Sequence, residues 1–103
     1  MSNLVWQDAW VLLAVKSAQG KSQFASREDV IKAGDFINHA VFLDSEIEHA
    51  LSVLNPMALL SEQSGYFAVG PNFQTFWDQC GAQMTRSVHQ QLDLIAEHLG
   101  VER

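Results

Sequence analysis

The segment 44–54, followed by Asn55-Pro56, constrains the fold of this chain more than any other stretch. Its apolar residues recur at helical spacing and share one face of a helix: Ile47, Ala50, Leu51 and Leu54. Proline lacks the amide that would continue the helix and restricts the residue before it, so the helix must end at Asn55-Pro56. Two short apolar runs, 57–60 and 66–69, then flank a polar link at 61–65 and predict a β-hairpin.

A second helix is expected just before this one. Ser26 and Asp29 have the spacing of a capping box, so we predict a helix from there to about Ile37, closed by Asn38 in the left-handed region. Gly34 lies inside this helix and indicates close approach to a neighbour. Phe24-Ala25 would add a very short third strand to the hairpin. The expected buried residues of the helix and the following turn are Val30, Ile31, Ala33, Ile37, Val41 and Phe42.

The first helix is predicted over residues 4–19, with Asn3 as its N-cap and Gly20 as its end. Its apolar side chains project around nearly the whole circumference, which is typical of a helix buried on more than one side. Two interpretations remain open. Either part of this helix forms a subunit interface, or the C-terminal helix covers it.

The last helix is predicted to extend through residues 73–99, capped by Asn72, with Gly81 bending or interrupting it. Its apolar stripe includes Cys80, which we interpret as a small buried hydrophobe. A helix of that length exceeds what a small domain can cover, so the sequence predicts a homodimer. The interface residues expected on the first and last helices are Trp6, Trp10, Leu13, Trp77, Met84 and Val88.

The pattern over residues 4–70 resembles the winged-helix branch of the helix-turn-helix superfamily. The matching positions are Glu46-Ile47, Ala50-Leu51 and Leu54, then 58–60, then 66–69. The resemblance implies a mainly α fold with a small β-hairpin, and a C-terminal helix at 72–99 completes a single domain, 1–103. It also implies that the helix at 44–54 would enter the major groove of DNA while the hairpin, or wing, contacts the backbone. Ala58 stands where the family often has glycine.

Charge argues against that use. The chain has 103 residues and a net charge of −6, and no Lys or Arg occurs between Lys32 and Arg86. Carboxylates near phosphate oppose DNA binding, and no counterion release compensates for them. The outward side chains of helix and hairpin are instead polar or acidic, and we predict that they face a protein partner: Ser45, Glu48, His49, Ser52, Glu62 and Gln63.

Two alternatives use other residues. A DNA-binding transcriptional regulator would depend on N-terminal cations: Lys16, Lys21, Arg27 and Lys32. A small metal- or ligand-binding protein could use His89, Asp93 and Glu97, which recur at helical spacing, or a flat-ligand pocket among the tryptophans. Ordinary solvent exposure also explains polar residues at the helical spacing of His89, Asp93 and Glu97. Core packing also explains the tryptophans. No serine–histidine–acid set, paired carboxylates or phosphate loop has local support, so we predict neither an enzyme nor a cofactor.

A cytoplasmic location is expected. The single Cys80 cannot form an internal disulfide. Residues 1–8 lack the basic and long apolar stretches of a signal peptide, and no long uncharged apolar window suggests a membrane span.

Overall fold

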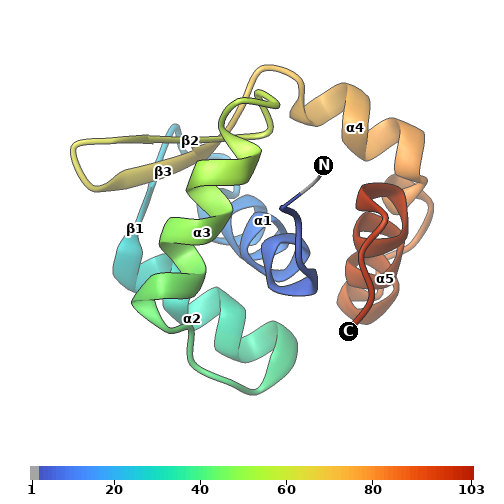
Figure 1. Ribbon diagram of the computed structural model, residues 1–103, viewed down its shortest axis with the longest axis horizontal. Coiled ribbons are helices and arrows are strands. Elements are labelled where there is room, and N and C mark those ends of the chain that lie inside the picture. The colour runs from blue at the N-terminus through green and yellow to red at the C-terminus, as the bar shows by residue number, and fades with distance from the viewer. Residues whose placement is uncertain (1–2) are drawn as a thin grey trace.

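The computed structural model describes residues 3–103 as a mainly helical domain with a small three-stranded antiparallel sheet. In Figure 1, α1 lies at the centre, with α2, α3 and the sheet to one side and α4 and α5 to the other. The elements are α1 (Trp6–Gln19), β1 (Ala25–Ser26), α2 (Arg27–Asn38), α3 (Asp44–Leu54), β2 (Leu60–Gln63), β3 (Tyr66–Val69), α4 (Phe73–Cys80), the 3-10 turn η1 (Ala82–Met84) and α5 (Val88–Leu99).

The start of α1 differs from the prediction. The helix begins at Trp6, and its N-cap is Val5 rather than Asn3. The physical reason is the carboxylate of Asp8, whose Oδ2 accepts a hydrogen bond from the Val5 amide at 2.8 Å and so satisfies a free N–H at the helix start. The predicted end at Gly20 is confirmed, with φ of 54°.

The chain itself covers α1. Residues 11–15 are 0% exposed, and α2, α3, α5 and β3 all pack against the helix. The prediction that α1 is buried on more than one side is confirmed. Four elements of one chain share this cover, so the burial of α1 does not require a second subunit, and the homodimer stays a prediction.

The α2–turn–α3 segment follows the prediction in part. Ser26 Oγ accepts the Asp29 amide at 3.1 Å, which confirms the N-cap of α2. The left-handed closing residue is His39, with φ of 55°, and not Asn38. Phe42 is buried as predicted, whereas Val41 is 66% exposed, because the turn directs only one of these neighbours inward. Ile31 and Ala33 are only half-buried.

Gly34 marks a close approach, as predicted. The indole Nε1 of Trp10 donates a hydrogen bond to the Gly34 carbonyl at 3.0 Å. The Phe42 ring lies so near that a Cβ on Gly34 would come within 2.2 Å of Cε2. Glycine is therefore required here by space, since larger residues would displace the Phe42 ring.

The hairpin is present, but its first strand is shifted. We predicted that strand at 57–60, whereas β2 is Leu60–Gln63 and the link shrinks to Ser64-Gly65. Both link residues have positive φ, 55° and 84°, as in the tight turns that match strand twist. Polar residues 61–63 extend because the hairpin tip projects beyond the core and needs no apolar pattern. The predicted third strand is confirmed by β1, which pairs with β3 in the order β1-β3-β2.

The C-terminal helix is interrupted at Gly81, which is one of the outcomes that the sequence left open, so residues 73–99 do not form one continuous helix. α4 ends at Gly81, whose φ of 81° closes it, and α5 begins after Ser87, whose Oγ accepts the Gln90 amide at 3.3 Å. The break lets α5 fold back to contact both α4 and α1. Met84 lies in this break and is 83% exposed, so it is not part of a continuous apolar stripe.

Candidate interaction surface

The outward side of α3 and the start of the hairpin form one surface. Ser45, Glu48 and Ser52 of α3 are exposed, as are Glu62 and Gln63 of β2. Because α3 packs against β2, Glu48, Ser52 and Glu62 line a shared hollow of about 430 Å³, together with Leu51 and Asn55. The structure thus brings three of the six predicted partner-facing residues together around one hollow. We call the surface formed by Ser45, Glu48, Ser52, Glu62 and Gln63 the α3–wing face.

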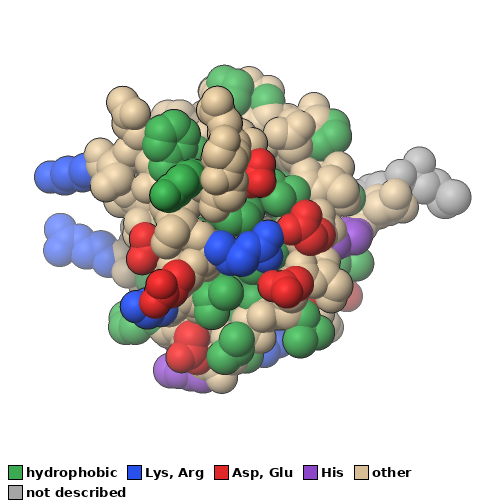
Figure 2. Space-filling view, turned by 90° about the vertical axis from the view of Figure 1, so that its left-hand side faces the viewer, with side chains coloured by type: hydrophobic (Ala, Val, Ile, Leu, Met, Phe, Trp, Pro, Cys, Tyr) green, Lys and Arg blue, Asp and Glu red, His purple; other side chains and the backbone are tan. Residues whose placement is uncertain are grey.

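Arg27, the first residue of α2, lies beside this face. Its guanidinium Nη2 lies 2.6 Å from Glu48 Oε1, and Nη1 lies 3.3 Å from Asp44 Oδ1. The same group sits over the Phe67 ring, 5.5 Å from its centroid. Figure 2 shows this side of the molecule, where a basic side chain at the centre lies among acidic ones. The charge of Arg27 is therefore balanced by two carboxylates of α3.

The other N-terminal cations do not gather around Arg27. Lys32 pairs with Glu28 on its own helix at 3.1 Å. Lys16 lies over the ring of Trp77, 4.4 Å from its centroid, which places it against α4. Lys21 is exposed in the connector after α1. A DNA-binding regulator that uses these cations would need them in one basic patch, and the structure does not place them together.

His49 has a role that the sequence did not reveal. Its Nδ1 lies 2.8 Å from Oδ1 of Asp8, whose side chain is 0% exposed. The second oxygen of Asp8 accepts the Val5 amide. His49 is half-buried, and it lines a small hollow of about 170 Å³ with Ser45 and Asp8. His49 therefore links α3 to α1, and its place on a partner-facing surface stays a prediction.

This pair was missed because its members lie far apart in the sequence. Asp8 falls within a run of apolar residues, where an acid has no reason to be buried unless a partner meets it. That position is the one signal in the sequence. It indicates a buried partner without identifying His49.

The expected dimer residues lie mainly inside one chain. Trp10 is 3% exposed and Leu13 is 0% exposed, so they form core and not surface. Trp6 and Trp77 are also buried, and Val88 is half-buried. Only Met84 of the six is exposed. These positions on α1 are therefore filled by the chain's own core and give no support for an interface there.

The remaining candidate ligands stay apart from any metal geometry. His89, Asp93 and Glu97 are exposed along α5, and within residues 3–103 no group of three or more His, Cys, Asp or Glu side chains is placed to hold a metal ion. Cys80 is buried, and its Sγ donates to the Trp77 carbonyl at 3.3 Å. Burial raises the pKa of the Cys80 thiol because the thiolate would lose hydration, and the charge of Asp78 adds to the effect.

We also compared the chain with known proteins. No protein-family model, curated protein or solved structure matched the chain. Within the described residues, no helix combines the length and apolar composition needed to cross a bilayer.

Proposed function

We propose that this chain is a winged-helix domain whose α3–wing face binds a protein rather than DNA. The order of elements supports the first part. A helix and a short strand precede the α2–turn–α3 pair, and a hairpin follows, with the sheet ordered β1-β3-β2. This is the arrangement expected from the resemblance at residues 4–70.

The ion pairs of Arg27 support the second part of the proposal, that this face binds a protein and not DNA. A DNA-reading helix needs free cations for phosphates and donors for base edges. Here the nearest cation is already held by Asp44 and Glu48 of α3 itself. Phosphate approaching this helix would meet those carboxylates and the exposed Glu62, and binding would release few counterions.

The surface suits a partner with basic side chains. Arg27 supplies one positive charge against the carboxylates of Asp44, Glu48 and Glu62, so the face keeps a net negative charge. Leu51 and Ser52 line the same hollow as Glu48 and Glu62, which adds apolar contact. Complementary charge speeds encounter and suppresses wrong partners, while the apolar floor contributes affinity. The acidic net charge of −6 adds long-range attraction.

A pair of charge reversals tests this proposal. Glu48→Lys/Glu62→Lys should remove the partner that co-purifies with the wild-type chain from host cells. Asp35→Lys/Asp78→Lys changes net charge equally at other exposed positions and should retain it. Circular dichroism of both variants confirms that each remains folded.

DNA binding is measured directly in parallel. Electrostatic attraction to DNA is strongest at low salt, so low salt is the most sensitive condition for this test. Under it, fluorescence anisotropy with a labelled random-sequence duplex should give no saturable binding by the wild-type chain. Salt-sensitive binding that weakens when Lys16 and Lys21 are replaced would contradict the proposal and support a DNA-binding regulator.

A further inference from the structure

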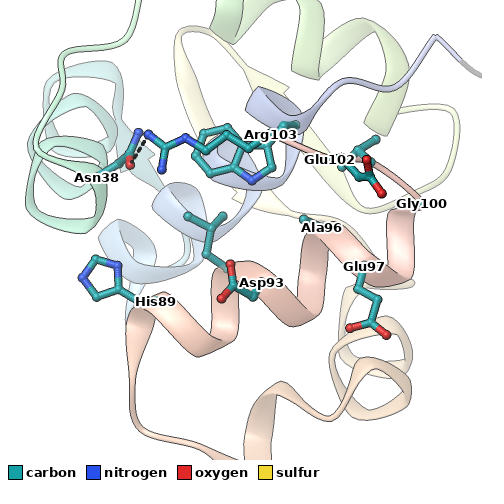
Figure 3. A pocket seen from close by; sticks show the side chains of 11 residues that line it. Asn38, His89, Asp93, Ala96, Glu97, Gly100, Glu102 and Arg103 are labelled. Atoms are coloured by element: carbon teal, nitrogen blue, oxygen red, sulfur yellow. Dashed lines mark hydrogen bonds between the residues drawn. The ribbon is translucent and has the colours of Figure 1, made fainter.

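A trough lies on another side of the molecule, between α5 and the ends of α1 and α2. Two hollows, of about 830 Å³ and about 550 Å³, share Trp6, Asn38 and residues 100–103 in their lining. Residues 100–103 therefore cross the trough and divide it. Figure 3 shows α5 along one side with His89, Asp93 and Glu97, and Arg103 reaching towards Asn38 on the other.

Arg103 fixes this crossing segment in place. Its guanidinium carbon lies 4.5 Å from the centroid of the Trp6 ring. Its Nη2 donates a hydrogen bond to Asn38 Oδ1 at 3.1 Å. An indole face attracts a cation, and a planar guanidinium can stack on the ring while its N–H groups reach an acceptor. Trp6 and Asn38 together thus present a seat for one guanidinium group.

The surroundings of this seat are acidic. Glu46, Asp93, Glu97 and Glu102 line the two hollows. Among the described lining residues, Arg103 supplies the single Lys or Arg charge. Such a trough favours cationic ligands and opposes nucleic acid. Its length along α5, from His89 to Glu97, suits an extended peptide better than a small amine.

We propose that this trough binds an arginine-containing segment of a basic protein, and that Arg103 occupies the guanidinium seat in the free chain. A partner's arginine stacks on Trp6 and donates to Asn38 in place of Arg103. Asp93 and Glu97 attract neighbouring basic residues of the same segment. This surface is separate from the α3–wing face, and the inference does not rest on the proposed function.

Arg103→Gln provides the main test, because glutamine removes the internal cation and keeps a polar side chain. The probe is a fluorescein-labelled peptide of alternating arginine and glycine, followed by anisotropy. Loss of the competing stacking interaction should tighten binding by about three- to tenfold relative to wild type. Unchanged or weaker binding by Arg103→Gln overturns the proposal.

Matched variants locate the binding surface. In the Arg103→Gln background, Asp93→Asn/Glu97→Gln should weaken peptide binding. Asp35→Asn/Asp78→Asn removes two exposed carboxylates that line neither the trough nor the α3–wing face, and should leave binding unchanged. Unchanged binding by the first pair, or an equal loss with the second, overturns the trough. Failure of the host-partner experiment above, with these results intact, would overturn only the proposed function.

Two further readouts test the seat itself. The indole N–H signal of Trp6 and the side-chain amide signals of Asn38 should shift in NMR spectra on addition of the arginine peptide. A lysine–glycine peptide of equal length should bind more weakly, since an ammonium group cannot stack as a plane. Equal affinity for both peptides, or shifts confined to α3, overturns the arginine assignment.

Discussion

Among the described residues, Asp8 is the buried acidic side chain, and its two contacts explain why its burial is tolerated. One carboxylate oxygen caps α1 through the Val5 amide, and the other meets His49 on α3. A buried carboxylate is expensive to desolvate, so losing either contact leaves it poorly compensated. The pair therefore fixes the position of α3 against the central helix.

Replacing His49 tests that role. We expect His49→Ala to lower the free energy of unfolding by about 1–3 kcal/mol, because Asp8 keeps its burial but loses a hydrogen-bonding partner. Urea denaturation followed by tryptophan fluorescence measures the change. Ser52→Ala, at an exposed position of the same helix, should stay within about 0.5 kcal/mol of wild type. An unchanged midpoint for His49→Ala would contradict a structural role for the pair.

Cys80 gives a prediction with a defined pH dependence. Burial raises the pKa of its thiol in the folded chain above the unfolded value, so the neutral form is favoured by folding. The associated stability is complete below the unfolded pKa, about 8.5, and is lost as pH rises through the higher folded pKa. We expect unfolding free energy to fall above that pH, and Cys80→Ala to remove this part of the decrease.

Alkylation by iodoacetamide provides an independent check on the same thiol. The native chain should react more slowly at pH 8 than the urea-unfolded chain, because fewer thiolates are present and the sulfur is shielded. Equal rates in the two states would show that Cys80 is accessible and ionises normally.

At the scale of elements, the hairpin turn has an unfavourable residue at one position. Ser64 adopts φ of 55° and precedes Gly65, at 84°. Turns with both central residues in this region favour Asn-Gly, since asparagine tolerates the left-handed region better than serine. Ser64→Asn should stabilise the fold by about 0.5 kcal/mol, whereas Ser64→Val should destabilise it by about 1 kcal/mol. Thermal unfolding monitored by circular dichroism measures both, and a more stable valine variant would contradict this turn geometry.

The elements also show which features sequence reasoning can reach. Local signals predicted α2, the end of α3 at Pro56 and the strand β3, since caps, proline and apolar spacing act within a few residues. The start of β2 was missed, and the sequence did not decide whether Gly81 bends the last helix or ends it. Both features depend on a core that is assembled from distant segments of the chain. The hairpin with β2 projects from this core, and the break at Gly81 lets α5 return to it.

The same division holds for the candidate site. The exposure of Glu48, Ser52 and Glu62 could be predicted from the helix face and the hairpin. The pairing of Arg27 with Asp44 and Glu48 could not, because it joins the start of α2 to α3 across the tertiary fold. Because of that contact, the positive charge of Arg27 beside the α3–wing face is neutralised. The charge distribution, and not only the number of charged residues, therefore disfavours DNA binding.

At the scale of the whole molecule, the apolar surface predicts the oligomeric state. α1 is enclosed by its own chain, and the expected dimer residues Trp10 and Leu13 are core. Among the described residues, the most exposed large hydrophobics fall in two places, with Phe36, Val41 and Leu43 around the α2–α3 turn and Met84 between α4 and α5. A stable dimer usually buries roughly 1,200–2,000 Å² with a continuous apolar centre, whereas three hydrophobics at one turn and a lone methionine are ordinary on monomers.

We therefore expect light scattering after size exclusion to give the mass of one chain over a wide concentration range. Met84→Gln should leave that mass unchanged, because an isolated exposed methionine does not hold two chains together. A concentration-dependent dimer would contradict this expectation. If Met84→Gln abolished such a dimer while Phe36→Gln did not, the interface would lie at the α4–α5 break, and the enclosure of α1 would still stand.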